Sequence, residues 1–340
     1  MTSSLKTNRF GDINMKIVIT IANFCDDALN YLKDKGFDVH HYSGPSLGAG
    51  VADDTLFEVV KDADVIIAGT ETYRPSLLAR LPKLKLISRN GIGYDAIDQE
   101  GLKTNGIGLT HTRGFVEGAV AEQIMAYILY FARRIDQQNA LMHAHQWKSK
   151  LEPGAKNHTL GLVGFGGIGT ETAKRAVPFG MKVLYYCRHP NPQEPTYGAE
   201  YAELDELLAQ SDYVAACVPL TDETYHFFDA KKIAKMKKGA CLINIARGPV
   251  VDEHALADSL KSGHLSSCAV DVYPKEPCTD SPLADCPTAV LTPHTASSTV
   301  ENMREMNFAA ADNVINYLNG ALDPKPEFGR IYQIKKLSVL

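Results

Sequence analysis

The sequence predicts an α/β protein built from two Rossmann-like domains, each a parallel sheet covered by helices. Short apolar runs typical of buried strands alternate with helical patterns along most of the chain, and this alternation occurs in two successive series. A glycine-rich turn follows the first strand of the second series, as is typical of a dinucleotide-binding sheet. A length of 340 residues also exceeds what one hydrophobic core usually supports.

The first series begins after a polar N-terminal stretch, residues 1–14, which lacks the apolar centre of a secretory signal. A helix is expected over residues 25–36, with Gly36 at its C-terminal cap. The longest helical pattern covers residues 118–145 and carries a broad apolar stripe, so we interpret it as a hinge helix between the domains. The strands expected in this series cover residues 15–20, 64–70, 84–89 and 108–111.

The second series contains six strand-like runs, the number found in a complete dinucleotide-binding sheet. An amphipathic helix over residues 299–318 lies beyond these runs and is expected to return to the first domain. We therefore expect a discontinuous substrate-binding domain of residues 1–112 and 298–340, and a dinucleotide-binding domain of residues 113–297. The six strands are expected at residues 160–164, 182–187, 213–218, 240–246, 267–272 and 289–291.

The composition is that of an ordinary globular protein, with 45% hydrophobic and 22% charged residues and a net charge of −5. Without a basic surplus, the chain is not expected to bind nucleic acid or an anionic membrane, and no apolar run approaches the ~20 residues of a membrane span. Seven cysteines without a CxxC pair indicate reduced thiols in a cytoplasmic protein, and no metal site is predicted.

A GxGxxG turn opens the second series, with the residues Gly164, Phe165, Gly166, Gly167, Ile168 and Gly169. It follows an expected strand and begins an expected helix, which is the context that gives this pattern its meaning. Glycines allow the backbone to approach a pyrophosphate closely, and the helix N-terminus supplies N–H donors and a positive dipole end. The turn therefore predicts a nicotinamide dinucleotide as the cofactor.

The residues that would read the ribose of this cofactor contain no carboxylate. An NAD enzyme normally places Asp or Glu at the end of the second strand, but this chain has Cys187, Arg188 and His189 there. A thiol does not repel a 2′-phosphate, and the Arg188 guanidinium can pair with one. We therefore expect NADP(H) to be preferred, with NAD(H) also used if Arg188 points to solvent.

Three polar side chains follow the ends of the last three expected strands, and their types fit one reaction. Arg247 offers a planar fork of donors that matches a carboxylate, and its charge can polarise a neighbouring carbonyl. His294 can donate and accept a proton, and Glu276 can orient its ring and favour the imidazolium. Because the carboxyl ends of parallel strands share one edge, we expect these residues to converge and to reduce a 2-keto acid with hydride from the nicotinamide.

Several motifs make the chain resemble one family over roughly residues 15–320, the D-isomer-specific 2-hydroxyacid dehydrogenases. The resemblance implies a flavodoxin-like substrate domain, a homodimer, and the roles of Arg247, Glu276 and His294 given above. It points to glyoxylate/hydroxypyruvate reductases, or to phosphoglycerate dehydrogenases without a regulatory domain. The motifs are SRNGIGYDAID (88–98), VAE (120–122), GFGGIG (164–169), VPLT (218–221), NIARG (244–248), DVYPKEP (271–277), SPL (281–283) and TPHTA (292–296).

Further residues take roles only through this resemblance. Ile92 and Gly93 match positions whose backbone N–H groups bind the substrate carboxylate, and Asp271 matches the residue that holds the nicotinamide amide. Many members read N-T-P where this chain reads His111-Thr112-Arg113. The remaining cofactor contacts are expected at Val218, Pro219, Thr224, Ile245 and Ala246.

Two alternatives stay open at this point. Arg89, next to the Ile92–Gly93 loop, could bind a second anionic group, which would favour a phosphorylated or sugar-derived hydroxy acid. The other alternative is a non-catalytic NAD(H)-sensing scaffold of the same fold, which predicts the loss of a catalytic residue or long binding tails. All three catalytic candidates are present, and no regulatory domain is expected after Gly320.

Overall fold

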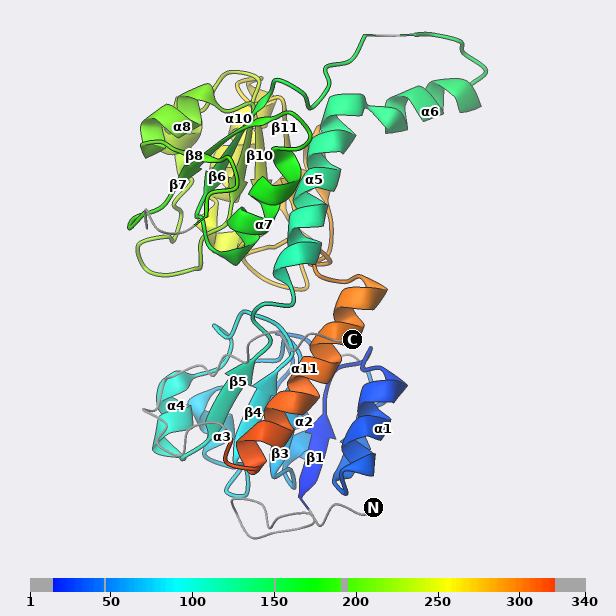
Figure 1. Cartoon of the computed structure of the whole chain (residues 1–340), viewed down its shortest axis with the longest axis vertical. Helices are drawn as coiled ribbons and strands as arrows, with labels where there is room; N and C mark the ends of the chain where they lie inside the picture. The colour runs from blue at the N-terminus through cyan, green and yellow to red at the C-terminus, as the bar shows by residue number, and fades with distance from the viewer. Residues whose placement is uncertain (1–14, 46, 150, 191–194, 322–340) are drawn as a thin grey trace. The chain divides into compact units, whose positions relative to one another are not determined.

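The computed structural model of the chain describes residues 15–45, 47–149, 151–190 and 195–321 (Figure 1). The chain divides into two compact units. The first unit contains the described residues up to Val116 together with those from Ser298 onward, and the second contains Glu117–Ser297. The polar N-terminal stretch and residues 322–340 of the expected substrate domain lie outside the described residues.

The first unit is a five-stranded sheet in the order β2-β1-β3-β4-β5, and all of its strand pairs are parallel. This is the flavodoxin-like strand order, so the predicted fold class is confirmed for this unit. The second strand was not predicted, because its residues alternate between exposed and half-buried at the sheet edge and form no apolar run. The strands are β1 (Lys16–Ile19), β2 (Asp38–His41), β3 (Val65–Ala68), β4 (Leu86–Arg89) and β5 (Gly108–His111).

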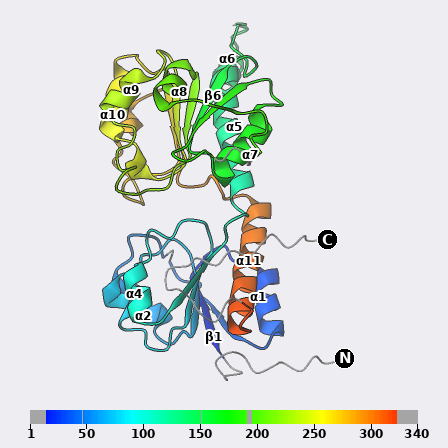
Figure 2. The same cartoon turned by 60° about the vertical axis from the view of Figure 1, so that its left-hand side comes forward.

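Helices cover both faces of this sheet, with α1 and α11 on one face and α2 and α4 on the other (Figure 2). The alternation of side chains along β1 explains this arrangement, because Ile17 and Ile19 join the core under α1 and α11 while Val18 joins the opposite core. The Thr299 hydroxyl caps α11 by accepting the Asn302 N–H. The helices are α1 (Asp26–Asp34), α2 (Asp53–Val60), α3 (Pro75–Leu78), α4 (Gln99–Thr104) and α11 (Val300–Leu318).

The second unit is a seven-stranded parallel sheet in the order β12-β11-β10-β9-β6-β7-β8. Numbered along this unit, the order is the 3-2-1-4-5-6 of a dinucleotide-binding sheet with a seventh strand added, which confirms the predicted Rossmann class. The expected count of six was wrong, because it omitted β8, which has only two residues. The strands are β6 (Thr159–Val163), β7 (Lys182–Tyr186), β8 (Glu200–Tyr201), β9 (Tyr213–Ala216), β10 (Cys241–Asn244), β11 (Ser267–Val270) and β12 (Ala289–Leu291).

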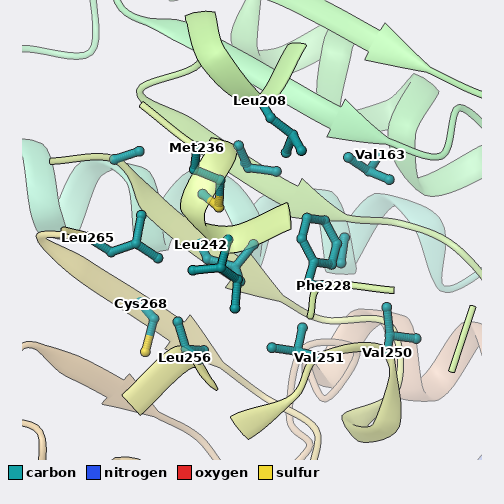
Figure 3. Close-up of a cluster of buried hydrophobic side chains, with 14 of the residues drawn as sticks. Val163, Leu208, Phe228, Met236, Leu242, Val250, Val251, Leu256, Leu265 and Cys268 are labelled. Carbon is teal, nitrogen blue, oxygen red and sulfur yellow. The ribbon is translucent and has the colours of Figure 1, made fainter. Parts of the chain in front are cut away.

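One core of the second unit lies between this sheet and the helices α8, α9 and α10, while α5 and α7 lie on its other side (Figures 2 and 3). Phe228 and Leu242 are fully buried there, and Leu256 reaches the same cluster from α10. All residues of β9, β10 and β11 are buried, which explains why their sequences are largely apolar. The helices are α5 (Glu117–Arg133), α6 (Ile135–His143), α7 (Gly167–Ala176), α8 (Leu204–Gln210), α9 (Ala230–Lys235) and α10 (Glu253–Lys261).

The single long helix expected over residues 118–145 is wrong, because the structure breaks it at Arg134. Arg134 has φ 47°, in the left-handed region, and separates α5 from α6. The apolar stripe ends near residue 132, and no side chain of α6 is buried among the described residues. Helix α6 therefore projects from its unit (Figure 1). Among the described residues, no helix is long and apolar enough to cross a membrane.

A buried histidine, His111, ends β5 in the first unit. Its Nδ1 accepts the Arg113 N–H at 3.2 Å, and its ring lies 5.9 Å from that of Tyr94 between centroids. Burial, followed by the charges of Arg113 and Arg89, lowers the pKa of His111 from 6.5 to about 4. The His111 imidazole is therefore neutral at physiological pH.

This environment predicts a defined dependence of stability on pH. Because the folded-state pKa is depressed, the unfolded chain binds the His111 proton more readily, so stability is full above pH 6.5 and falls as the pH drops towards 4. We expect His111→Asn to reduce the stability lost between pH 7 and 4.5 by about 1–2 kcal/mol, after allowance for solvent screening. Urea unfolding of wild type, His111→Asn and the exposed control His143→Asn at both pH values measures this. An unchanged pH dependence in His111→Asn would contradict it.

Candidate active site

Three adjacent parallel strands, β10, β11 and β12, bring the predicted catalytic side chains to one edge of the second unit's sheet. Arg247, Glu276 and His294 each follow the end of one of these strands. The His294 Nδ1 lies 2.7 Å from the Glu276 Oε2, and the charge of Arg247 is near enough to influence Glu276. The structure therefore brings all three predicted residues together.

Glu276 is an ionised acceptor. Its Oε1 accepts the Tyr273 N–H at 3.0 Å, and its Oε2 pairs with His294. Burial alone would raise the pKa of Glu276, but the hydrogen bond and charge of His294, the Tyr273 N–H and the charge of Arg247 outweigh burial and lower it. Because an ionised carboxylate only accepts, Nδ1 of His294 carries the shared proton, and Nε2 is left for proton exchange.

The backbone of His294 is held in an uncommon conformation by Asp271. His294 has φ 53°, in the left-handed region, and its N–H donates to the Asp271 carbonyl at 2.8 Å. The buried Asp271 carboxylate accepts the Thr292 hydroxyl at 2.6 Å and the N–H groups of Thr295 and Ala296 at 2.8 and 2.9 Å. In this structure Asp271 therefore fixes the turn that carries His294, a role beyond the nicotinamide contact implied by the resemblance.

Asn244, the last residue of β10, fixes the turn that carries Arg247. Its side-chain amide donates to the Arg247 carbonyl at 3.0 Å, and its Oδ1 accepts the Ala246 N–H at 3.2 Å. The half-buried Arg247 guanidinium donates to the Ala246 carbonyl at 2.7 Å. The sequence analysis did not assign Asn244 a role, although a buried amide at a strand end was a usable signal. Ile245 and Ala246 are buried in the same turn.

The glycine-rich turn has the geometry of a phosphate cradle. Gly164 follows β6 with φ 101°, and a Cβ there would collide with the Cys217 carbonyl oxygen, so only glycine fits. Gly166 precedes α7, whose N-terminus receives no side-chain cap from the described residues. Its N–H groups and dipole can therefore serve an anion. Val218 lies beside Gly164, and these residues fit the pyrophosphate of a dinucleotide.

The predicted ribose-reading segment follows β7 at the same edge of the sheet. Arg188 is exposed, and its Nη1 donates to the Glu223 Oε2 at 3.0 Å. His189 is also exposed. Thr224, predicted to contact the cofactor, uses its hydroxyl within its own turn, donating to the Pro219 carbonyl at 2.6 Å. The sequence analysis did not anticipate Glu223, because its proximity to Arg188 depends on two loops 35 residues apart.

The predicted substrate-binding residues lie in the first unit, with Arg89 at the end of β4 and with Ile92 and Gly93 on the loop that follows. Gly91 has φ 146° and is fixed by Thr112, which accepts its N–H at 2.8 Å and donates to its carbonyl at 3.1 Å. The Arg89 guanidinium folds under this loop and donates to the Asn90 carbonyl. Within the described chain, the N–H groups of Ile92 and Gly93 donate to no protein acceptor.

Among the residues the structure describes, no group of three or more His, Cys, Asp or Glu side chains is placed to hold a metal ion. The seven cysteines, which all belong to the described chain, form no disulfide.

Comparisons with known proteins agree with this geometry. The family model for the NAD binding domain of D-isomer specific 2-hydroxyacid dehydrogenases matches residues 125–296. A glyoxylate reductase of Thermococcus litoralis is 39% identical over 280 residues, 79% of this chain and 85% of that protein. A glyoxylate/hydroxypyruvate reductase B of Escherichia coli is 37% identical over 306 residues, 88% of this chain and 93% of that protein. The crystal structure of a glyoxylate reductase from Paecilomyes thermophila has a TM-score of 0.79 at 29% identity, covering 91% of this chain and 96% of that one.

These matches confirm the resemblance found in the sequence, and they cover both units of the chain. The family model lies within the unit that carries the glycine-rich turn and the Arg247, Glu276 and His294 cluster. The chain belongs to the D-isomer specific 2-hydroxyacid dehydrogenase family and is a nicotinamide-dependent oxidoreductase.

Proposed function

We propose that the protein reduces small 2-keto acids such as glyoxylate and hydroxypyruvate to the D-2-hydroxy acids, with His294 as the acid–base residue. The observation that carries this proposal is the 2.7 Å contact between the His294 Nδ1 and the ionised Glu276 carboxylate. It leaves the other ring nitrogen available for the substrate oxygen. The names of the relatives in Thermococcus litoralis and Escherichia coli support the substrate class.

The roles follow from the donors and charges that each residue offers. Arg247 binds the substrate carboxylate through its planar fork and polarises the C2 carbonyl. For the Ile92 and Gly93 N–H groups, the family resemblance supports a role as donors to a substrate carboxylate. When bound, a nicotinamide would supply the hydride that C2 accepts. His294 Nε2 donates its proton to the carbonyl oxygen, Glu276 stabilises the ring, and the same proton returns to His294 in the reverse direction.

Replacing the proton donor tests this mechanism. We expect His294→Asn to lower kcat for glyoxylate by about 10²–10⁴-fold, the usual effect of losing acid–base catalysis, with little change in cofactor Kd. Steady-state kinetics and fluorescence titration with NADPH measure the two quantities, and exposed His254→Asn is the control. Turnover near the wild-type rate would remove His294 from the mechanism. A wild-type protein that binds the cofactor but turns over no 2-keto acid would favour the scaffold alternative.

The cofactor is proposed to be NADP(H) in preference to NAD(H). Residues 187–189, which follow β7, include no carboxylate to repel a 2′-phosphate, and Arg188 supplies several N–H donors at this position. The side chains of Arg188 and Glu223 are both exposed, so their ion pair contributes little free energy and Arg188 can pair with a phosphate instead. The pyrophosphate would lie on the Gly164–Gly169 turn. Further contacts are proposed for Cys187, His189, Val218, Pro219, Thr224, Ile245, Ala246 and Asp271.

Paired kinetics test this preference directly. We expect kcat/KM to favour NADPH over NADH by roughly 10-fold or more, the effect of one charge-assisted hydrogen bond. The double substitution of Cys187→Asp with Arg188→Ala should reverse the order, because it restores an acceptor for the ribose diol and removes the cation. Lys238→Ala, an exposed cation elsewhere in the unit, is the control. A wild-type preference for NADH would refute the role of Arg188.

A second substrate class, phosphorylated or sugar-derived hydroxy acids, depends on Arg89. The Arg89 guanidinium donates to the Asn90 carbonyl, and its charge lowers the pKa of the buried Glu71 carboxyl against the effect of burial. These contacts favour smaller, unphosphorylated acids. We also propose that the protein works in the cytoplasm, which the absence of any disulfide among its seven cysteines supports.

The protein is further proposed to form a homodimer through the segment made of α6 and the described residues that follow it, 144–149 and 151. No side chain of α6 is buried, and Trp147 is 87% exposed in the single chain. Ile135, Met142 and Leu151 are exposed on the same segment. Exposed apolar side chains gathered on one segment indicate a surface that a partner covers, and a second copy fits the dimer implied by the family resemblance.

Disrupting this segment tests the dimer. We expect the wild type to have twice the chain mass of 37.2 kDa by light scattering after size exclusion. Trp147→Asp combined with Leu151→Asp should give a monomer, because charged groups would be buried without partners. Phe179→Asp, which changes an exposed apolar residue elsewhere, should remain dimeric. A monomeric wild type, or a dimer unaffected by the double substitution, would contradict the proposal.

A further inference from the structure

The carboxyl edge of the first unit's sheet contains a buried acid that the proposed mechanism does not use. Glu71 follows β3 and is 1% exposed. In the described chain, no hydrogen bond of ordinary geometry reaches either of its oxygens. The Thr20 hydroxyl is close, but it donates to the Ile67 carbonyl at 3.2 Å. The hydroxyl of Tyr73, which is also fully buried, has no partner in the described chain either.

An unpartnered buried carboxyl is costly, so it needs an explanation. Leaving a buried charged acceptor without a donor typically costs more free energy than leaving a neutral group without one. Burial raises the pKa of Glu71, while Thr20, the nearby backbone N–H groups and the charge of Arg89 oppose that rise only in part. Among the described residues, no donor makes a hydrogen bond of ordinary geometry to this acid, and a ligand that carries a donor would supply one.

The position of Glu71 places it beside the proposed substrate loop. Its Oε1 lies 3.1 Å from where a Cβ on Gly69 would be, so the carboxyl folds back over Gly69. The preceding residue, Ala68, pairs with Arg89 on β4, and its carbonyl accepts the Asn90 N–H at 3.0 Å. Gly69 is half-buried and the next residue is exposed, so the carboxyl lies just beneath the surface at this edge. Ile92 and Gly93 are on the same loop as Asn90.

The charged groups around Glu71 indicate whether its ligand group is anionic, cationic or neutral. Arg89 is close enough to influence the pKa of Glu71, and His111, at the end of the neighbouring β5, is neutral. The Glu71 carboxylate would repel an anionic group such as a phosphate, and the Arg89 guanidinium would repel an ammonium group. A neutral hydroxyl remains, because it can donate to the Glu71 carboxyl without introducing a charge.

We propose that Glu71 determines specificity for 2-keto acids that carry a hydroxyl on C3, which donates its proton to the Glu71 carboxyl. This inference rests on the proposed function, because it takes the Ile92–Gly93 loop as the binding place of the substrate carboxylate. Hydroxypyruvate has this hydroxyl, pyruvate has a methyl group at the same carbon, and glyoxylate has no such carbon. The three acids therefore separate the contribution of the hydroxyl from that of the shared keto-acid group.

The kinetic test compares these three substrates with the holoenzyme. We expect wild-type kcat/KM for hydroxypyruvate to exceed that for pyruvate by about 10-fold or more, as for one hydrogen bond to a charged group. Glu71→Gln should reduce this ratio by about 10-fold and leave kcat/KM for glyoxylate within about 3-fold, because glyoxylate does not reach residue 71. Glu58→Gln, on the exposed face of α2, should change neither quantity.

A binding test does not depend on turnover or on the folding of the variant. With wild-type enzyme and reduced cofactor, which cannot accept hydride from a hydroxy acid, we expect D-glycerate to bind about 10-fold more tightly than D-lactate, which lacks the hydroxyl on C3. Equal affinities would overturn the proposal, as would an equal loss of activity on all three substrates in Glu71→Gln. If no keto acid is reduced but D-glycerate still binds more tightly than D-lactate, and Glu71→Gln removes this difference, the proposed function fails while the assignment of Glu71 stands.

Discussion

The parallel alignment of strands is the constraint on which the rest of this structure depends. In the second unit, Asn244 pairs with Val270, and Val270 pairs with Leu291, so three strands end side by side. The residues that follow these strand ends therefore lie at one edge of the sheet. Arg247, Glu276 and His294 are far apart in sequence but are neighbours for this reason. The proposed catalytic edge is therefore a consequence of strand register before any side chain makes a specific contact.

Two buried acids show how differently a fold can treat the same chemical group. The Asp271 carboxylate is fully supplied with donors from residues 292–296, and this satisfaction offsets both its own burial and the left-handed backbone of His294. Glu71 is as deeply buried, but the described chain provides it with no full hydrogen bond. The burial of Asp271 is explained by the turn that its hydrogen bonds stabilise. For Glu71, we propose a hydrogen-bond donor on a ligand.

Each unit controls the charge of buried groups at one edge of its own sheet. Glu276 stays ionised because His294, Tyr273 and Arg247 together outweigh the cost of its burial. In the other unit, His111 is kept neutral by burial and by the charges of Arg113 and Arg89. Each unit thus fixes the protonation state of its buried groups near neutral pH through contacts within that unit.

The sequence by itself determined the two parallel sheets, most of their strands, the glycine-rich turn and the three residues that gather at β10, β11 and β12. These signals are local, because apolar runs, turn glycines and strand-end motifs each consist of residues adjacent in the sequence. Only the tertiary structure decided the break at Arg134, the edge strands β2 and β8, the Arg188–Glu223 pair and the unpartnered Glu71. Each of these depends on what packs, or fails to pack, against a residue from a distant part of the chain, and no local pattern of residues contains that information.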